Sequence, residues 1–343
     1  MRLPWQTAAP ALNLALQGGG AHGAFTWGVL DALLEDGELA FDGVSGTSAG
    51  AMNAVVLAQG LMDGGREGAR AALRRFWTAV AGSLPFEVAV PRADGNGYQL
   101  APAMRLMLQW THHFTPEQLN PFDLNPLRDV LRDQLDIEAL RRRSPVRLFI
   151  ATTEANTGRL RLFGNADLSL EAVLASACLP RLHRSVVIDG QPHWDGGYAA
   201  NPAVYPLLLD TPTRDTLLVM LTPLRYASAP QSARDIEQRM HELAFNATFL
   251  REMRLFALLR ERIGPIAWWR RGPLERRLAQ ARFHAIEPGP VLGELDTETK
   301  AAAGQRFFEM LFEAGRAQGR QWLERHRPSV GRLSTVDIAG LFG

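Results

Sequence analysis

A serine lies in the segment GTSAG, residues 46–50, between a short apolar run and a stretch of small and apolar residues. Gly46, Ser48 and Gly50 match the pattern G-x-S-x-G, in which a sharp turn between a strand and a helix holds a nucleophilic serine. The tight turn needs small flanking residues, and the helix that follows directs the positive end of its dipole toward developing negative charge. The spacing therefore predicts that Ser48 is a nucleophile, with an ordinary structural turn as the alternative interpretation.

A second glycine-rich segment, LALQGGGAHGAF, covers residues 14–25. Gly18, Gly20 and Gly23 form G-x-G-x-x-G, which binds dinucleotides where a strand precedes it and a helix follows. That use also needs an acidic residue at the tip of a second strand, whereas Asp36 and Glu38 come at the end of the predicted helix. Backbone amides in such a loop bind a phosphate or another anion by the same physics, so the pattern alone does not identify the ligand.

A nucleophilic serine needs a partner that accepts its proton. Two late histidines are candidates: His241 lies in an arginine-rich helical stretch, and His284 lies where a late strand is expected. Asp195 is the better candidate, because it ends an extended segment in HWDGG and because Gly196 and Gly197 leave room around its carboxylate. Taken alone, this segment favours an ordinary Asp-Gly turn, and the other two motifs are what shift the interpretation toward a catalytic Asp195.

The elements that must position these residues alternate between strands and helices. Strands are predicted at 12–16, near 41–46, and at 146–155, 159–163, 185–197 and 215–223, and helices at 23–36, up to 60 after the serine turn, and at 67–80, 126–135 and 169–178. This alternation predicts an α/β fold in which a mostly parallel central sheet is covered by helices on both faces. After Pro230 the pattern is helical almost to the end, so we expect a core over residues 10–226 and a mainly helical C-terminal region over 227–343.

Residues 84–126 are rich in proline, glycine, asparagine and aromatic residues. This composition predicts a long loop region with one short helix near 103–110, of the kind that forms a lid or contacts an acyl chain. The segment IGPIAWWRRGPLERR, residues 263–277, places Trp268 and Trp269 beside Arg270 and Arg271. It is interpreted either as a membrane-surface contact or as a helix end packed by tryptophans.

The overall composition fits a globular protein. The chain has 343 residues, of which 46% are hydrophobic and 21% are charged, and its net charge of +1 gives no reason to expect nucleic acid as a partner. Cys178 is the single cysteine, which excludes an intrachain disulfide and suits a reducing compartment. Neither a secretory signal nor a long apolar span is evident, so we expect a cytoplasmic protein, with contact to a membrane or lipid-droplet surface left open. The sequence does not indicate an oligomeric state.

Together, the segments at 18–23, 46–50 and 195–197 resemble those of the patatin-like phospholipases in order and approximate spacing, as do residues 151–158 and 175–182. The resemblance covers roughly residues 12–225. It implies a three-layer α/β fold and hydrolysis of fatty-acyl esters by a Ser48–Asp195 dyad without histidine, and it requires no cofactor or metal. Its implied site residues are the oxyanion-hole glycines Gly18, Gly19 and Gly20, and the motif-supporting glycines Gly23, Gly46, Gly50, Gly196 and Gly197.

The sequence departs from this family at His22, where many members carry arginine or lysine. A histidine supplies positive charge only when it is protonated. Ester hydrolysis therefore follows from the resemblance more directly than a preference for phospholipids over lysophospholipids or neutral glycerides.

Three alternatives accompany this interpretation. One is an esterase that acts on a thioester or an intracellular polyester with the same residues. Another is a nucleotide-binding protein that uses Gly18, Gly20 and Gly23, which leaves the serine turn and the Asp-Gly-Gly segment unexplained. The third is a catalytically silent scaffold of the same fold, against which the intact Ser48 and Asp195 argue.

Overall fold

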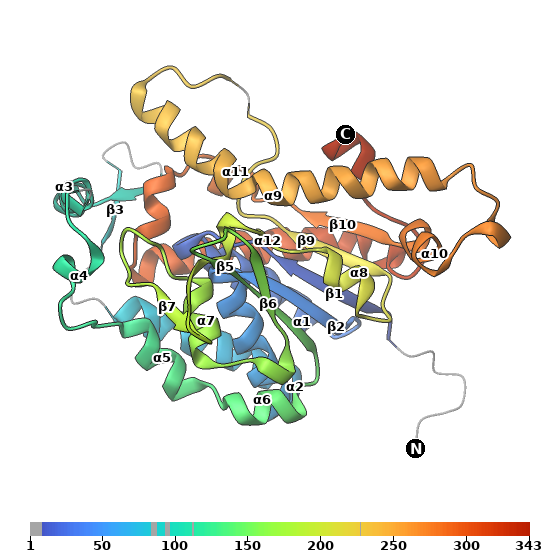
Figure 1. Ribbon diagram of the computed structural model, residues 1–343, viewed down its shortest axis with the longest axis horizontal. Coiled ribbons are helices and arrows are strands. Elements are labelled where there is room, and N and C mark those ends of the chain that lie inside the picture. The colour runs from blue at the N-terminus through green and yellow to red at the C-terminus, as the bar shows by residue number, and fades with distance from the viewer. Residues whose placement is uncertain (1–8, 84–87, 93–96, 112, 227) are drawn as a thin grey trace.

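A computed structural model of the chain describes residues 9–83, 88–92, 97–111, 113–226 and 228–343 (Figure 1). At its centre is an eight-stranded sheet with the strand order β10-β9-β1-β2-β5-β8-β7, in which β6 pairs with β5. The strands of this sheet are β1 (Ala11–Leu16), β2 (Ala40–Thr47), β5 (Arg147–Glu154), β6 (Leu160–Phe163), β7 (Val186–Ile188), β8 (Gln191–Asp195), β9 (Asp215–Val219) and β10 (Arg282–Ile286).

Five neighbouring strands, from β10 to β5, run parallel, and β6 and β8 are antiparallel to β5. The carboxyl ends of the parallel strands therefore meet along one side of the sheet, which we term the carboxyl edge, and their amino ends form the amino edge. The glycine run follows β1 and Ser48 follows β2, so both lie at the carboxyl edge. The expected mostly parallel sheet is confirmed.

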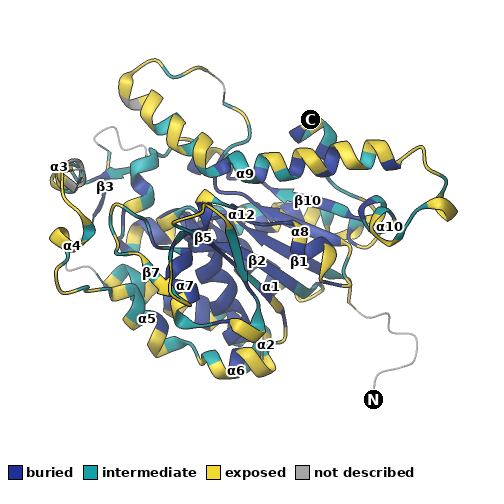
Figure 2. Cartoon of the chain, in the orientation of Figure 1, coloured by how far each residue is buried: buried dark blue, intermediate teal, exposed yellow. Residues whose placement is uncertain are grey.

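Helices cover both faces of this sheet, which confirms the expected three layers (Figures 1 and 2). Side chains alternate along β1, so that Leu12, Leu14 and Leu16 pack into one apolar core and Ala15 packs into another. The first core also contains residues of α1 (Gly23–Asp36), α2 (Ala49–Gly82) and α12 (Gln305–His326). The second contains residues of α8 (Tyr205–Leu209), α9 (Ala233–Ile263) and α13 (Ile338–Phe342).

Glycines end or bend the first two helices. α1 spans the predicted residues 23–36 and ends at Gly37, whose φ of 78° is the left-handed conformation of a helix C-cap. The two helices expected after the serine turn are joined into α2, and the non-helical backbone of Gly64 and Gly65 marks the kink between them.

The region 84–126 holds more structure than expected, although residues 84–87, 93–96 and 112 lie outside the described part. β3 (Ala89–Pro91) and β4 (Tyr98–Leu100) form a two-stranded ribbon, followed by α3 (Pro102–Thr111) and α4 (Pro116–Leu119). The remaining helices along the chain are α5 (Pro126–Gln134), α6 (Ile137–Arg143), α7 (Leu170–Ser176), α10 (Pro273–Gln280) and α11 (Gly289–Gly293). Among the described helices, none is both long and apolar enough to cross a membrane.

The C-terminal region is mainly helical, as expected, and its strand lies around His284, where a late strand was predicted. β10 extends the central sheet beside β9, and α12 packs along α1. A strand of five residues between helices leaves a weak periodic signal, and pairing with β9 is what stabilises it.

Candidate active site

Ser48 lies in a sharp turn between β2 and α2. Its φ of 54° and ψ of −122° are a conformation that residues other than glycine rarely adopt. The backbone amide of Ser48 donates a hydrogen bond to Oγ of Ser176 at 3.0 Å, and its side chain is 9% exposed. The turn therefore holds the nearly buried Ser48 at the N-terminus of α2.

Asp195 ends β8 and is completely buried. Three backbone-directed hydrogen bonds fix it: its amide donates to the Cys178 carbonyl at 2.8 Å, its carbonyl accepts from the Thr153 hydroxyl at 2.8 Å, and Oδ1 accepts from the Gly197 amide at 2.8 Å. β5 separates β8 from β2, and pairing across β5 brings the end of β8 level with the end of β2.

The electrostatics of Asp195 are unusual for a carboxyl group. Burial raises its pKa to about 7, although the Gly197 amide and the Ser48 hydroxyl both lower it. Oδ2 is buried and accepts no hydrogen bond from any residue in the described part of the chain. Ser48 thus lies near enough to lower the pKa of Asp195, although its hydroxyl makes no well-formed hydrogen bond to Oδ2.

Gly18 approaches the serine turn closely. A Cβ on Gly18 would lie 2.9 Å from Cβ of Ser48 and 2.8 Å from the Thr47 carbonyl oxygen, so only glycine fits. Its amide donates a hydrogen bond to Oδ1 of Asn201 at 2.7 Å. The amide of Gly18 is therefore occupied, which corrects the expectation that it points toward a substrate.

Gly19 and Gly20 differ from Gly18 in this respect. Their amides donate no hydrogen bond to another residue within the described ranges. Gly20 begins the short helix η1 (Gly20–His22) with a φ of 56°, and a Cβ there would meet the backbone of Lys300. Two of the three predicted amides are thus free to bind an anion.

The supporting glycines lie where α1, β2, α2 and the short helix η3 (Gly196–Tyr198) pack against neighbouring backbone or side chains. They are Gly23, Gly46, Gly50, Gly196 and Gly197.

The family model of the patatin-like phospholipases matches residues 14–208, which is more than half of the 343 residues. The chain belongs to the patatin-like phospholipase family. The matched range contains Ser48, Asp195 and the glycines described above, and it ends before α9 begins. No curated protein matches the chain. Among solved structures, VipD from Legionella pneumophila is similar with a TM-score of 0.38 and 14% identity, over 93% of this chain and 67% of that chain.

His22, where many members of this family carry a basic residue, is neutral in this chain. It is buried, and desolvation together with the positive charge of Lys300 lowers its pKa to about 3. Nε2 of His22 lies 2.8 Å from Oγ1 of Thr299, in the short helix η5 (Thr297–Ala301). Protonation of His22 is therefore not a source of positive charge at neutral pH.

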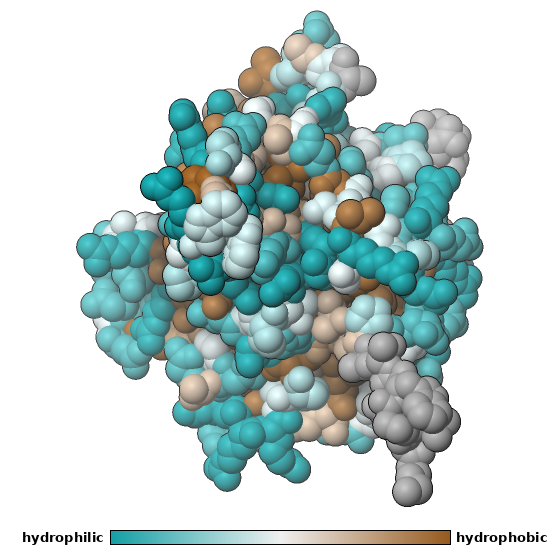
Figure 3. All heavy atoms as spheres, turned by 90° about the vertical axis from the view of Figure 1, so that its right-hand side faces the viewer, coloured by the Kyte–Doolittle hydropathy of each residue, from teal (hydrophilic) through white to brown (hydrophobic). Residues whose placement is uncertain are grey.

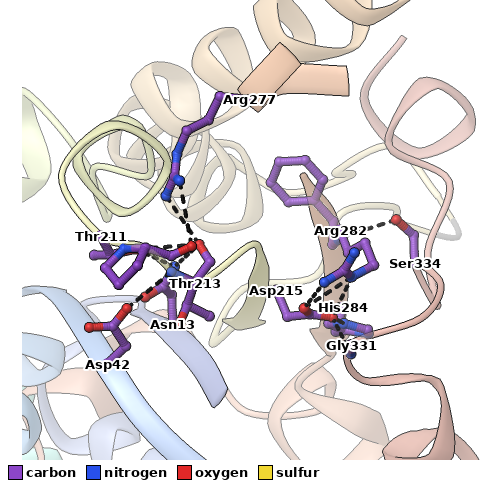
Figure 4. A network of polar contacts seen from close by, with 12 residues as sticks. Asn13, Asp42, Thr211, Thr213, Asp215, Arg277, Arg282, His284, Gly331 and Ser334 are labelled. Carbon is purple, nitrogen blue, oxygen red and sulfur yellow. Dashed lines mark hydrogen bonds and ion pairs between the residues drawn. The ribbon is translucent and has the colours of Figure 1, made fainter. Parts of the chain in front are cut away.

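The two histidines that were considered as partners of Ser48 lie elsewhere. His284 is in β10, where Nε2 contacts Oδ1 of Asp215 at 3.1 Å (Figure 4). Its Nδ1 contacts Oγ1 of Thr335 at 3.0 Å. Asp215 begins β9, so this network lies toward the amino edge and ties the C-terminal tail to the sheet. His241 is exposed on α9. Neither histidine contacts Ser48.

Trp268 and Trp269 form the short helix η4 (Trp268–Arg270) and are 68% and 67% exposed. This exposure contradicts the interpretation in which they pack a helix end. η4 precedes α10 and β10 in the chain, which places it at the amino edge, away from Ser48 (Figure 1).

The residues that sequence reasoning missed are those that hold the site in place. Asn201 and Ser176 bind backbone amides of Gly18 and Ser48, and Thr299 binds His22. The resemblance had indicated the segments around Ser176 and Thr153 without a role for either side chain. Within the described ranges, no group of three or more His, Cys, Asp or Glu residues is arranged to hold a metal ion.

Proposed function

We propose that this member of the patatin-like phospholipase family is a serine hydrolase that cleaves fatty-acyl esters of lipids through Ser48 and Asp195. The observation that carries the proposal is the pairing of a strained, nearly buried serine with a fully buried carboxyl group whose pKa is raised to about 7. A carboxylate with an ordinary pKa is too weak a base for a serine hydroxyl, and a raised pKa reduces this mismatch.

In the acylation step, Asp195 accepts the proton of the Ser48 hydroxyl as the oxygen attacks the ester carbonyl carbon. The negative charge on the tetrahedral intermediate rests on the amides of Gly19 and Gly20, which have no other acceptor in the described part of the chain. As the intermediate collapses, the bond to the alcohol breaks. Asp195 then returns its proton to the leaving oxygen, which leaves the acyl group on Ser48.

In the deacylation step, water takes the place of the alcohol. Asp195 accepts a proton from the water, whose oxygen attacks the acyl-enzyme carbonyl, and the same amides stabilise the second intermediate. Collapse of this intermediate releases the fatty acid, and the proton passes from Asp195 to the Ser48 oxygen. The free enzyme is regenerated without a cofactor in either step.

Family membership supports a lipid acyl ester as the substrate class. A thioester or polyester would use the same residues, so a substrate panel must separate these cases. A nucleotide site is less well supported, because Ser48 follows the tip of β2, where a ribose-binding acidic residue would be needed.

The proposal is tested with Ser48→Ala and Asp195→Asn, assayed against a phospholipid, a lysophospholipid, a triglyceride, an acyl thioester and a short-chain ester. Each variant should lower turnover by roughly a thousandfold or more. Ser45→Ala is the matched control, because Ser45 is buried in β2, the strand that Ser48 follows, and its hydroxyl has no hydrogen-bond partner in the described part of the chain. Activity retained within tenfold in Ser48→Ala, or lost equally in Ser45→Ala, would contradict the proposal.

A further inference from the structure

A group of exposed apolar side chains lies in and after α3. Within this stretch, the exposed large apolar residues range in exposure from 40% for Leu119 to 83% for Phe122. We define the apolar rim as the residues Leu106, Met107, Trp110, Phe114, Leu119, Phe122 and Leu124. So many large apolar side chains exposed within one short segment are unusual for a protein surface, and such patches commonly mark a binding surface.

One end of the apolar rim is tied to the glycine side of the proposed site. Nε of Arg105, on α3, lies 2.9 Å from Oε2 of Glu298. Glu298 belongs to η5, whose residue Thr299 contacts His22 of η1. The Arg105–Glu298 ion pair therefore links the start of the apolar rim to η5, the segment that packs against η1 beside the free amides.

The other end is tied to the Asp195 side. Nη2 of Arg184 donates hydrogen bonds to the carbonyls of Asn120 and Pro121, each at 3.0 Å. Arg184 lies a few residues after Cys178, whose carbonyl accepts the amide of Asp195. The apolar rim thus stands at the carboxyl edge, attached to both halves of the proposed site (Figure 1).

The charges within this stretch are balanced. Residues 102–128 contain two arginines and two acidic residues, Glu117 and Asp123. Arg105 pairs with Glu298, and Nη1 of Arg128 lies 3.4 Å from Oδ2 of Asp123. Because both arginines of this stretch are paired, the apolar rim exposes apolar and aromatic groups and carries no net positive charge.

We propose that the apolar rim inserts into the surface of a zwitterionic phospholipid bilayer and holds the opening of the Ser48 site against it. The inference rests on the proposed function, because lipid is the occupant that a lipid acyl hydrolase must meet at this edge. Tryptophan and phenylalanine suit the boundary between headgroups and acyl chains. Because the local charges are balanced, binding depends on apolar contact and not on anionic lipid.

The amino edge provides a matched control. Trp268 and Trp269 are as exposed as Trp110, but they lie beside Arg270 and Arg271. The face seen from the side of α10 is covered mainly by hydrophilic residues, with apolar residues scattered among them (Figure 3). Aromatic residues there do not adjoin the proposed site.

The test measures co-sedimentation with phosphatidylcholine vesicles in the Ser48→Ala background, so that binding does not depend on turnover. Trp110→Ser with Phe122→Ser should weaken binding at least tenfold, whereas Trp268→Ser with Trp269→Ser should change it less than about twofold. Binding should persist when the salt concentration is raised several-fold, because screening acts on charges. In the active enzyme, the rim variant should lower the ratio of vesicle-ester to soluble-ester hydrolysis at least tenfold.

Three results would overturn the proposal: equal binding by parent and rim variant, equal losses in the two double variants, or binding that needs anionic lipid and disappears with salt. Self-association of the parent without lipid, abolished in the rim variant, would also overturn it by making a second copy the occupant. Because all four side chains are exposed, the melting temperature of each variant should match that of the parent. Vesicle binding as expected, without any Ser48-dependent hydrolysis, would contradict the proposed function and leave the docking inference intact.

Discussion

His22 donates the hydrogen on Nε2 to the hydroxyl oxygen of Thr299, 2.8 Å away. The hydroxyl hydrogen of Thr299 is already donated to the Asp296 carbonyl at 2.6 Å, so its oxygen can only accept from His22. Both side chains are buried, and Thr299 lies outside the range matched by the family model. A residue of the C-terminal region thereby fixes the tautomer and orientation of a histidine beside the proposed oxyanion amides.

Thr299→Val keeps the shape of the side chain and removes this acceptor. The buried Nε2 hydrogen then has no partner, which should cost about 1–3 kcal/mol in the free energy of unfolding. We expect kcat to fall about tenfold with little change in KM, because displaced amides matter most for the transition state. Thr299→Ser restores the acceptor and should recover most of the turnover. A variant that loses stability but keeps full kcat would mean that Thr299 has no influence on the oxyanion amides.

The pH dependence of turnover should follow Asp195. A general base must be charged, so kcat should rise with pH through about 7 and level off above it. His22, with a pKa of about 3, does not titrate in this range. Glu252 is the control, because burial also raises its pKa to about 7 while its carboxylate binds the amides of Val204 and Tyr205. The inflection should persist in Glu252→Gln. If it disappeared there, the titrating group would be Glu252, and the assignment to Asp195 would be wrong.

Asp195→Asn should stabilise the fold at alkaline pH. The pKa of Asp195 in the folded chain, about 7, lies above its ordinary value of 3.8, so folding favours the protonated carboxyl. Its stabilising contribution is complete below pH 3.8 and is lost as pH rises through 7. The permanently neutral asparagine avoids that loss, which amounts to ~4 kcal/mol at most. Denaturant unfolding at pH 8 and pH 3 checks this, and a variant less stable than wild type at pH 8 would contradict the burial argument.

Removal of His284 should affect stability and not chemistry. His284 is buried and joins Asp215 to Thr335, so His284→Ala should lower the free energy of unfolding by roughly 2–3 kcal/mol. Turnover per folded molecule should stay within about twofold of wild type, since this network lies toward the amino edge and makes no contact with Ser48 or Asp195. Loss of turnover at an unchanged melting temperature would revive the Ser–His alternative.

Patterns within short segments were enough to predict the elements that position the site. Apolar residues at helical spacing, followed by Gly37, predict α1 with its observed bounds. The alternation of strands and helices predicts the layered sheet, and the order of the three motifs indicates the family. These features are local, so the sequence records them directly.

The contacts that complete the site cannot be predicted from patterns within short segments. Asn201 occupies the amide of Gly18, and Thr299 orients His22, because folding brings distant segments together. Charge at His22 could not be predicted either, since burial beside Lys300 decides it. The exposure of Trp268 and Trp269 and their place at the amino edge likewise depend on where β10 joins the sheet.

The most direct test of the account is to trap the acyl-enzyme and find which residue carries it. The enzyme is mixed with an excess of an activated long-chain acyl ester, quenched in acid within one turnover, digested and sequenced by mass spectrometry. We expect one acyl group per chain on the peptide that contains Ser48, absent in Ser48→Ala and strongly reduced in Asp195→Asn. An acyl group on another residue, or turnover with no acylated Ser48 at any time, would contradict it.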